Sequence, residues 1–439
     1  MGRQTISWGE SDTIALLDQS MPFNLTMALP GIFQDIDEAR IPLWTLRMNY
    51  KLFEDWGPLS GGFLDTYLVP GSIDTTVSQV PVPVASPYSP PSGDPQAFID
   101  NLTAFIPADI RNTLIKAALG GLQFVQYDQL PSRTMSNSRY GVRLGALVAR
   151  DYTTSLWFYR TIAENPIPVF RPLDLTRAPI VHPGGTGPTQ LITATVHGLT
   201  SVFGGAVSFF SNPLNSIVRG EVEYFLDEPN FIPSQNIPFQ NLVRTPALKN
   251  LLIPLGAKIK PGPTTGFVPR ADSLRWEIGL DRFFFYRPLN PSNSFVWVSA
   301  LVGDWNVTET FTGKDFRYFG QLKATDTGLR TGANINAIHG ISDVGKLHTV
   351  STDFVDKKPV EWFIQSTMQT DYLHGKLEPR LTIVVNPRGT YAIPMSVEYR
   401  YTDNLLFDLR YTILWGGFFG TGFFRDRDQI LARMTLLLN

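Results

Sequence analysis

Apolar and polar residues alternate along many stretches of the chain. In residues 43–53, LWTLRMNYKLF, the even positions from Trp44 to Leu52 are apolar or aromatic, and the odd positions between them are polar. A period of two places successive side chains on opposite faces, so this stretch is predicted to be a β-strand with one apolar and one polar face. The same period recurs in residues 139–150, 216–226, 273–282 and 360–372.

The clearest predicted hairpin lies in residues 393–416. Two alternating runs flank Thr402-Asp403-Asn404, and such turn residues between alternating runs are a strong hairpin signal. We count roughly sixteen alternating segments along the chain, most of them about 9–12 residues long, which is the length that a tilted membrane-spanning strand needs.

Two stretches break the alternation. Residues 70–130 contain a Pro-rich run, VPVPVASPYSPPSGDP, followed by AFIDNLTAFIPADIRNTLIKAAL, which has helical periodicity. Residues 240–256 form a shorter candidate helix. We predict that 70–130 is an insert between strands. An ordered external loop is the favoured interpretation, and a lumen plug or a surface helix are the alternatives.

Composition narrows the class of protein. Charged residues make up 17% of the chain, below the roughly 25% that is usual in soluble domains, while aromatic residues reach 12%. The net charge of −2 and the lack of a basic run argue against a nucleic-acid partner. The chain has 0 cysteines, which excludes disulfides, thiolate metal sites and a cysteine nucleophile.

No apolar run approaches the ~18–20 residues of a spanning helix. Met1 is followed by polar residues rather than by a secretory leader, so we expect an exported form to be trimmed.

These patterns favour a transmembrane antiparallel β-barrel over a large soluble β-protein, which remains the alternative. Lipid cannot hydrogen-bond a strand edge, so strands that span a membrane must close on themselves. We predict an all-β fold in which residues 1–439 form a single barrel of roughly 14–18 strands, with the Pro-rich and helical insert 70–130 within it.

Polar faces of the predicted strands carry charges at mid-strand, which would line the lumen. The two signs are nearly balanced, so cross-strand ion pairs are expected rather than a strongly selective pore. The candidate lumen-lining residues are Arg47, Lys51, Arg143, Arg219, Glu221, Glu223, Arg275, Glu277, Glu361, Glu398, Arg400, Asp408 and Arg410. Aromatic residues near the ends of apolar faces would form a girdle at the membrane interface. The candidates are Trp8, Trp44, Trp276, Trp362 and Trp415.

The opening stretch GRQTISWGES follows the same logic. Gln4, Ile6 and Trp8 share one face of a predicted strand, and Gly9 would let the chain leave it. This face is expected to contact lipid, with Trp8 as an anchor at the interface.

No motif predicts a catalytic, cofactor or metal site. The five histidines lack zinc-ligand spacing, and HPGGTGPT at 182–189 lacks the Gly-Lys-Ser/Thr ending of a phosphate-binding loop. Asp35, Asp37 and Glu38 are acidic but lack the loop of an EF-hand, so a solvated turn is favoured over a Ca²⁺ site. His197 with Ser201 or Ser208 is a weak candidate for a barrel phospholipase. Residues 425–428, RDRD, are interpreted as a salt-bridged strand entry, with a charge ladder at the barrel mouth as the alternative.

The two ends of the chain carry a family resemblance. GRQTISWGES at the start and WGGFFGTGFFRDRDQILARMTLLLN at the end resemble the bacterial outer-membrane proteins grouped as domain of unknown function 1302. Typical members have a further N-terminal segment, and outer-membrane barrels commonly end in an aromatic residue, whereas this chain ends Leu438-Asn439. We therefore expect trimming at both ends.

The resemblance implies an outer-membrane barrel of Gram-negative bacteria without a settled activity. Members are often encoded beside lipid-handling envelope proteins, which favours passage of hydrophobic or lipid-like molecules across or out of the outer membrane. A structural barrel that scaffolds an envelope or surface complex is the alternative, and an enzyme is not expected. The expected partners are membrane lipid, lipopolysaccharide and envelope proteins, with no nucleic acid and no cofactor.

Overall fold

The protein is described by a computed structural model. The structure describes residues 1–9, 17–27, 32, 36–79, 123–164, 167–170, 190–229, 270–307, 360–387, 389–416 and 428–437.

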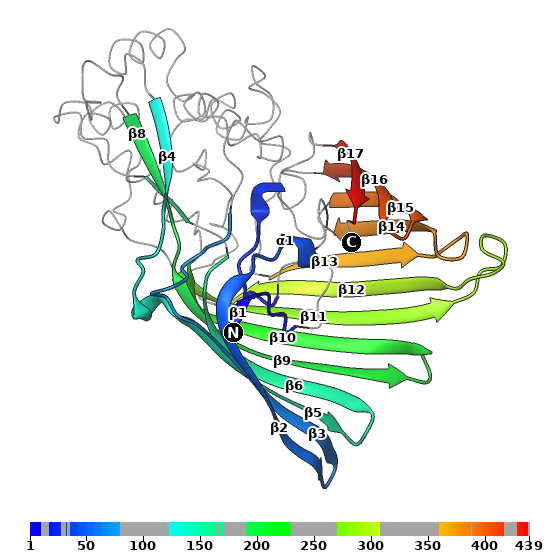
Figure 1. Ribbon diagram of the computed structural model, residues 1–439, viewed down its shortest axis with the longest axis horizontal. Helices are drawn as coiled ribbons and strands as arrows, with labels where there is room; N and C mark the ends of the chain where they lie inside the picture. The colour runs from blue at the N-terminus through cyan, green and yellow to red at the C-terminus, as the bar shows by residue number, and fades with distance from the viewer. Residues whose placement is uncertain are drawn as a thin grey trace, which may run out of the picture.

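One antiparallel sheet of 14 strands dominates the fold (Figure 1). Its strands, in hydrogen-bonded order, are β1 (Gly2–Gln4), β2 (Leu43–Trp56), β3 (Leu59–Val69), β5 (Arg139–Val148), β6 (Tyr152–Ile162), β9 (Leu199–Ser211), β10 (Ser216–Pro229), β11 (Arg270–Phe284), β12 (Phe295–Asn306), β13 (Val360–Gln369), β14 (Leu377–Asn386), β15 (Thr390–Thr402), β16 (Leu405–Gly416) and β17 (Gln429–Leu436). The predicted all-β class is confirmed, and the 14 strands of the large sheet within the described residues are at the low end of the predicted range.

A second, smaller sheet contains β4 (Gln123–Gln129), β8 (Gln190–Val196) and β7 (Ile167–Phe170). β4 pairs with β8 in parallel, and both project beyond the ends of the large sheet (Figure 1). Helix is scarce in the described residues: α1 (Ile36–Ala39) and the 3-10 turns η1 (Leu25–Met27) and η3 (Met135–Asn137).

The alternating pattern corresponds to the two faces of the large sheet. Side chains on the outward face are mainly apolar and many are exposed, whereas those on the concave face are mostly buried and combine polar and charged residues with an apolar and aromatic group. On the outward face the exposed residues include Leu46, Met48, Tyr50, Val142, Leu144, Leu156, Phe203, Val222, Ile278, Ile364, Ile383, Val397, Leu409 and Ile430. This distribution is the reverse of that in a soluble β-protein, in which the apolar face is the buried one.

Short connections gather at one end of the sheet. β2–β3, β5–β6, β9–β10 and β15–β16 are joined there by tight turns, and Ala149 and Arg150 in the β5–β6 turn have φ of 51° and 67°. The predicted hairpin is confirmed: β15 pairs with β16 around Asp403 and Asn404, with a bulge between Arg400 and Thr402.

The order of the strands is linear, with β1 and β17 at its ends. Among the described residues, no hydrogen-bonded pairing joins β17 to β1 or β2. Closure of the sheet into a barrel therefore stays a prediction.

Two sequence predictions need correction or limits. The first strand ends at Gln4, and Ile6 and Trp8 are fully buried instead of facing lipid, because the chain turns onto the concave face after β1. In the insert 70–130, residues 80–122 lie outside the described residues, and the part from Gln123 onward is the strand β4. The candidate helix 240–256 also lies outside them.

Candidate functional site

The concave face is partly filled by the chain that connects β1 to β2. We call its described residues 5–9, 17–27 and 36–42 the inner segment. Figure 1 shows it, with α1, on the concave side of the sheet. It reaches far from its own edge: Leu17 clusters with Ala300 and Val302 of β12, and Glu38 of α1 lies 2.8 Å from Arg433 of β17. The inner segment therefore extends across the interior of the curved sheet.

Trp8 anchors the inner segment to β3, β5 and β6. Its indole Nε1 donates to Asp65 Oδ2 at 3.0 Å, and its ring makes edge-to-face contacts with Tyr67 and Tyr159 at centroid distances of 5.0 and 6.3 Å. Gly141 gives the ring room, because an added Cβ would lie 2.6 Å from Trp8 Cη2. Arg47 holds Asp65 with two hydrogen bonds of 2.9 and 2.6 Å.

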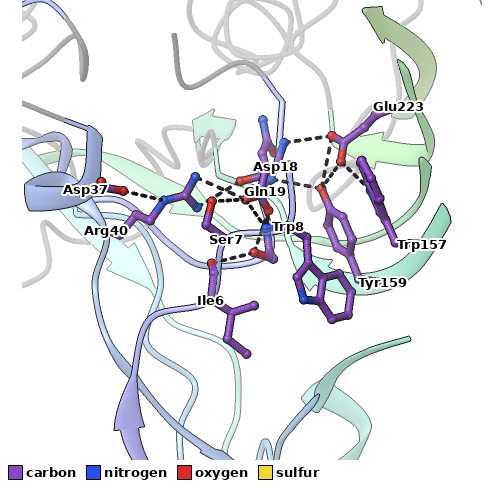
Figure 2. Close-up of polar contacts among 11 residues, drawn as sticks. Ile6, Ser7, Trp8, Asp18, Gln19, Asp37, Arg40, Trp157, Tyr159 and Glu223 are labelled. Atoms are coloured by element: carbon purple, nitrogen blue, oxygen red, sulfur yellow. Dashed lines mark hydrogen bonds and ion pairs between the residues drawn. The ribbon is translucent and has the colours of Figure 1, made fainter. Parts of the chain in front are cut away.

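Asp18 is the polar centre of the inner segment (Figure 2). Its carboxylate accepts hydrogen bonds from the Trp8 backbone at 2.8 Å and from Ser7 and Ser20 hydroxyls at 3.0 and 2.7 Å, and it lies 3.3 Å from Arg40 Nη2. Burial raises the pKa of Asp18, but the charge of Arg40 and these hydrogen bonds outweigh it, so the pKa lies below its ordinary value. The buried carboxylate thus ties the first and last parts of the inner segment together.

Glu223 of β10 binds the inner segment to the concave face of the sheet, which we call the wall. Glu223 Oε2 accepts the backbone N–H of Asp18 at 3.0 Å, and Oε1 accepts Trp157 Nε1 at 2.8 Å and Tyr159 OH at 3.2 Å. Tyr159 OH in turn accepts the backbone N–H of Gln19 at 3.0 Å (Figure 2). The buried carboxylate of Glu223 and the hydroxyl of Tyr159 therefore each satisfy one backbone donor of the inner segment.

Further ion pairs cover the concave face of β10, β11 and β12. Arg275 Nη2 lies 2.7 Å from Glu228 and Arg275 Nε lies 3.7 Å from Asp304, while Arg219 Nε lies 3.0 Å from Asp281. Glu164 is buried just beyond the end of β6, and burial raises the pKa of its carboxyl to about 8 despite the attraction of Arg275. Opposite charges on neighbouring strands thus compensate one another inside the fold.

A polar hollow remains on the concave face of the last five strands. Six of its lining side chains are charged, and both signs occur among them. The hollow is lined by Gln369, Glu378, Arg380, Ser396, Glu398, Asp408, Arg410 and Arg433. Since Arg433 also binds Glu38 of the inner segment, the hollow borders directly on that segment.

The candidate lumen-lining residues all lie on the concave face, in different environments. Arg219, Glu221, Glu223, Arg275, Glu277, Glu361 and Arg410 are buried, Arg143, Glu398 and Asp408 are partly buried, and Arg47 is exposed. Arg400 lies 3.8 Å from Glu398, and the exposed Lys51 pairs with Glu54 at 2.5 Å.

Of the candidate girdle residues, Trp44, Trp362 and Trp415 are exposed on the outward face, and Trp276 lies there half-buried, packed over Gly303. Trp8 is the correction: it is 0% exposed and belongs to the interior.

Sequence reasoning missed the residues that hold the inner segment: Asp18, Arg40, Asp65, Tyr67, Trp157 and Tyr159. A signal existed for Asp65 and Tyr67, because they alternate with apolar residues in β3 and so fall on its polar face. Asp18 and Arg40 lie in aperiodic sequence, where no pattern indicates a partner.

The residues of the less favoured candidate sites do not come together into sites among the described residues. Asp37 lies 3.9 Å from Arg40, Glu38 pairs with Arg433, and Asp35 is outside the described residues. Ser201 and Ser208 of β9 have opposite parity, so they lie on opposite faces of the sheet. Asp428 accepts the backbone N–H of Leu414 at 2.7 Å, whereas residues 425–427 lie outside the described residues. The loop 182–189 lies there too, as do His339 and His348, two of the five histidines.

Within the described residues, no three His, Asp or Glu side chains gather in an arrangement that could hold a metal ion. None of the helices described here is long and apolar enough to cross a membrane.

Comparison with known proteins identifies a family. Residues 1–436 match the family described as "protein of unknown function (DUF1302)". No curated protein matches the chain.

Proposed function

Since the chain belongs to the DUF1302 family of proteins of unknown function, we propose that it is a plugged outer-membrane β-barrel through which hydrophobic or lipid-like molecules cross or leave the membrane. The inner segment is the plug in this proposal, a role that the sequence had suggested for the insert 70–130. Membrane lipid and lipopolysaccharide are its surroundings, and the bacterial outer membrane is its location.

The reversed distribution of side chains carries the proposal. Leu409 and Ile430, on the outward face, are 54% and 73% exposed, whereas Glu223 and Arg275 on the concave face are 0% and 5% exposed. In water, exposing so large an apolar face is unfavourable, but in a bilayer that face is matched by lipid tails. Lipid cannot satisfy an unpaired strand edge, so the membrane form of the proposal requires the two ends of the strand order, β1 with β2 and β17, to be paired.

The surface beneath the inner segment favours apolar cargo over ions. Ile6, Trp8 and Met21 of the inner segment pack against a cluster of wall residues that is mainly apolar and aromatic. The wall members are Leu43, Tyr67, Val69, Trp157, Tyr159, Val202, Ala206 and Phe225. Displacement of the inner segment would expose this surface, which would bind apolar molecules better than hydrated ions.

A reversible cross-link between the plug and the wall tests the proposal. The chain has 0 cysteines, so Glu38→Cys with Arg433→Cys supplies the only two thiols, at side chains that meet at 2.8 Å. Cells with an intact lipopolysaccharide layer would express this variant, and entry of an apolar fluorescent dye would be followed before and after treatment with a short, cleavable thiol cross-linker. We expect linking to slow entry at least fivefold and cleavage to restore it.

Each single-cysteine variant, treated in the same way, is the matched control. Dye entry that is the same with the plug linked or free would contradict transport through the interior, and the scaffold role would become the better account.

A further inference from the structure

The inner segment places one of its own side chains in a slot built entirely by the wall. Asp65 and Tyr67 of β3, Gly141 of β5 and Tyr159 of β6 surround the ring of Trp8, which is 0% exposed. All four belong to paired strands of the sheet, so the slot does not depend on the inner segment for its construction.

From this arrangement we propose that the slot of Asp65, Tyr67, Gly141 and Tyr159 is a binding site. Its ligand is a planar, largely apolar ring compound with a hydrogen-bond donor on its edge. In the plugged state the Trp8 side chain occupies the place of this ligand. The inference deepens the proposed function, on which it rests, by naming the class of cargo.

The shape of the slot selects a flat ring. Tyr67 and Tyr159 meet the Trp8 ring at interplanar angles of 62° and 67°, which is the edge-to-face geometry that aromatic rings prefer. On a further side there is only Gly141, whose added Cβ would lie 2.6 Å from Trp8 Cη2. A bulky or branched group would collide with this backbone, whereas a ring the thickness of an indole fits.

The polar end of the slot selects a donor. Asp65 is 1% exposed, and its Oδ2 accepts the indole N–H while Arg47 fixes the carboxylate in position. An anionic group would be repelled by Asp65, and a ring without a donor would leave that acceptor bond unmade. The ligand is therefore neutral or cationic at this edge.

A second polar group in the slot lacks a partner. The hydroxyl of Tyr67 is buried, and no hydrogen bond to it occurs within the described part of the chain. An orphaned buried hydroxyl is costly unless something else satisfies it. Trp8 has no further polar atom to offer, so the side chain that fills the slot satisfies only one of its two polar groups. A ring compound with a second hydroxyl or amine could satisfy both.

Emptying the slot in the full-length protein tests the site. Trp8→Ala removes the ring, and indole is the probe, with 1-methylindole as a probe of similar shape that lacks the N–H donor. We expect saturable binding of indole to Trp8→Ala and not to the wild type, seen as a rise in the thermal midpoint, and at least tenfold weaker binding of 1-methylindole.

Two glycines supply matched controls in the Trp8→Ala background. Gly141→Ala would fill the slot and abolish indole binding. Gly220→Ala would leave binding unchanged, because its Cβ would lie 3.6 Å from its nearest neighbour, Val207. If Trp8→Ala fails to fold, Gly9→Ala replaces it: its Cβ would lie 2.6 Å from Glu221 Oε1 and 2.9 Å from Asp18 Cβ, so the chain next to Trp8 must shift, and we expect this shift to loosen Trp8 in the slot.

Equal affinity for the two probes, or binding that survives Gly141→Ala, would overturn the inference. Its failure is distinct from that of the proposed function. If cross-linking the plug stops dye entry but the protein binds indole and 1-methylindole equally, the transport function is supported and this binding site is not. If the protein binds indole as predicted but the cross-link does not change dye entry, the binding site is supported and the transport function is not.

Discussion

Gly141 determines how closely the Trp8 ring approaches the wall of the sheet. A Cβ at this position would lie 2.6 Å from both Trp8 Cη2 and Tyr67 Cε1, so both rings would have to move. We expect Gly141→Ala to lower the free energy of unfolding by about 1–3 kcal/mol through overpacking.

Gly220→Ala is the control, because it makes the same backbone change where a Cβ has ordinary contact, and its expected effect is within about 0.5 kcal/mol. Denaturant titration of both variants would measure the difference. Equal stabilities would show that Trp8 does not pack against Gly141.

Asp18 makes the docking of the inner segment depend on pH. Its folded-state pKa lies below the ordinary value, so its contribution to stability is complete above about pH 4 and is lost as the pH falls through the folded-state value. We expect Asp18→Asn to cost about 3–5 kcal/mol at pH 7, because it removes the buried carboxylate that lies closest to the buried Arg40.

The cost should shrink as the pH falls below about 4, because the carboxylate is then protonated in the unfolded protein while it is still ionised in the folded one. The measurement is the free energy of unfolding of both proteins from pH 3 to 7. A difference that stays constant over this interval would mean that the pKa of Asp18 is the same in the folded and the unfolded protein, which would contradict the account.

At the level of elements, the β5–β6 turn is a site of backbone strain. Ala149 and Arg150 both adopt positive φ, 51° and 67°, which is the conformation of a type I′ hairpin turn and favours Asn and Gly. Replacing the pair by Ala149→Asn with Arg150→Gly should stabilise the protein by about 1 kcal/mol. The same double replacement at Asp403 and Asn404, where positive φ is not found, should give no gain. Thermal unfolding would compare the two.

The strands were predictable from the sequence, since period-two alternation reports directly which face is polar. The ranges 139–150, 216–226 and 393–416 correspond to β5, β10 and the β15–β16 hairpin within a few residues. The path of the chain after β1 was not predictable. Gln4, Ile6 and Trp8 keep the alternation of a strand, but the Trp8 backbone N–H binds the Asp18 carboxylate instead of a neighbouring strand. That bond depends on a residue in aperiodic sequence.

At the scale of the whole molecule, the sequence predicts which face of the sheet is apolar and which is polar, but it does not predict what lies against each face. The predicted charged face is present, yet part of it is covered by the inner segment rather than by water, as the bond between Asp18 and the buried Glu223 shows. The contacts concerned join residues far apart in the chain, such as Asp18 with Glu223 and Glu38 with Arg433. Local periodicity carries no information on such pairs.

The account depends most on the outward face being in contact with lipid, and two adjacent positions in β15 test this at the same depth. Val397 is exposed on the outward face, and Ser396 lines the hollow on the concave face. Val397→Cys and Ser396→Cys, each labelled with a small fluorophore in protein reconstituted into bilayers, would be quenched with nitroxide-bearing lipid and with a water-soluble quencher. The account predicts that lipid quenches the label at 397 and spares the label at 396. Equal quenching of both labels by the water-soluble agent, with none by lipid, would contradict it.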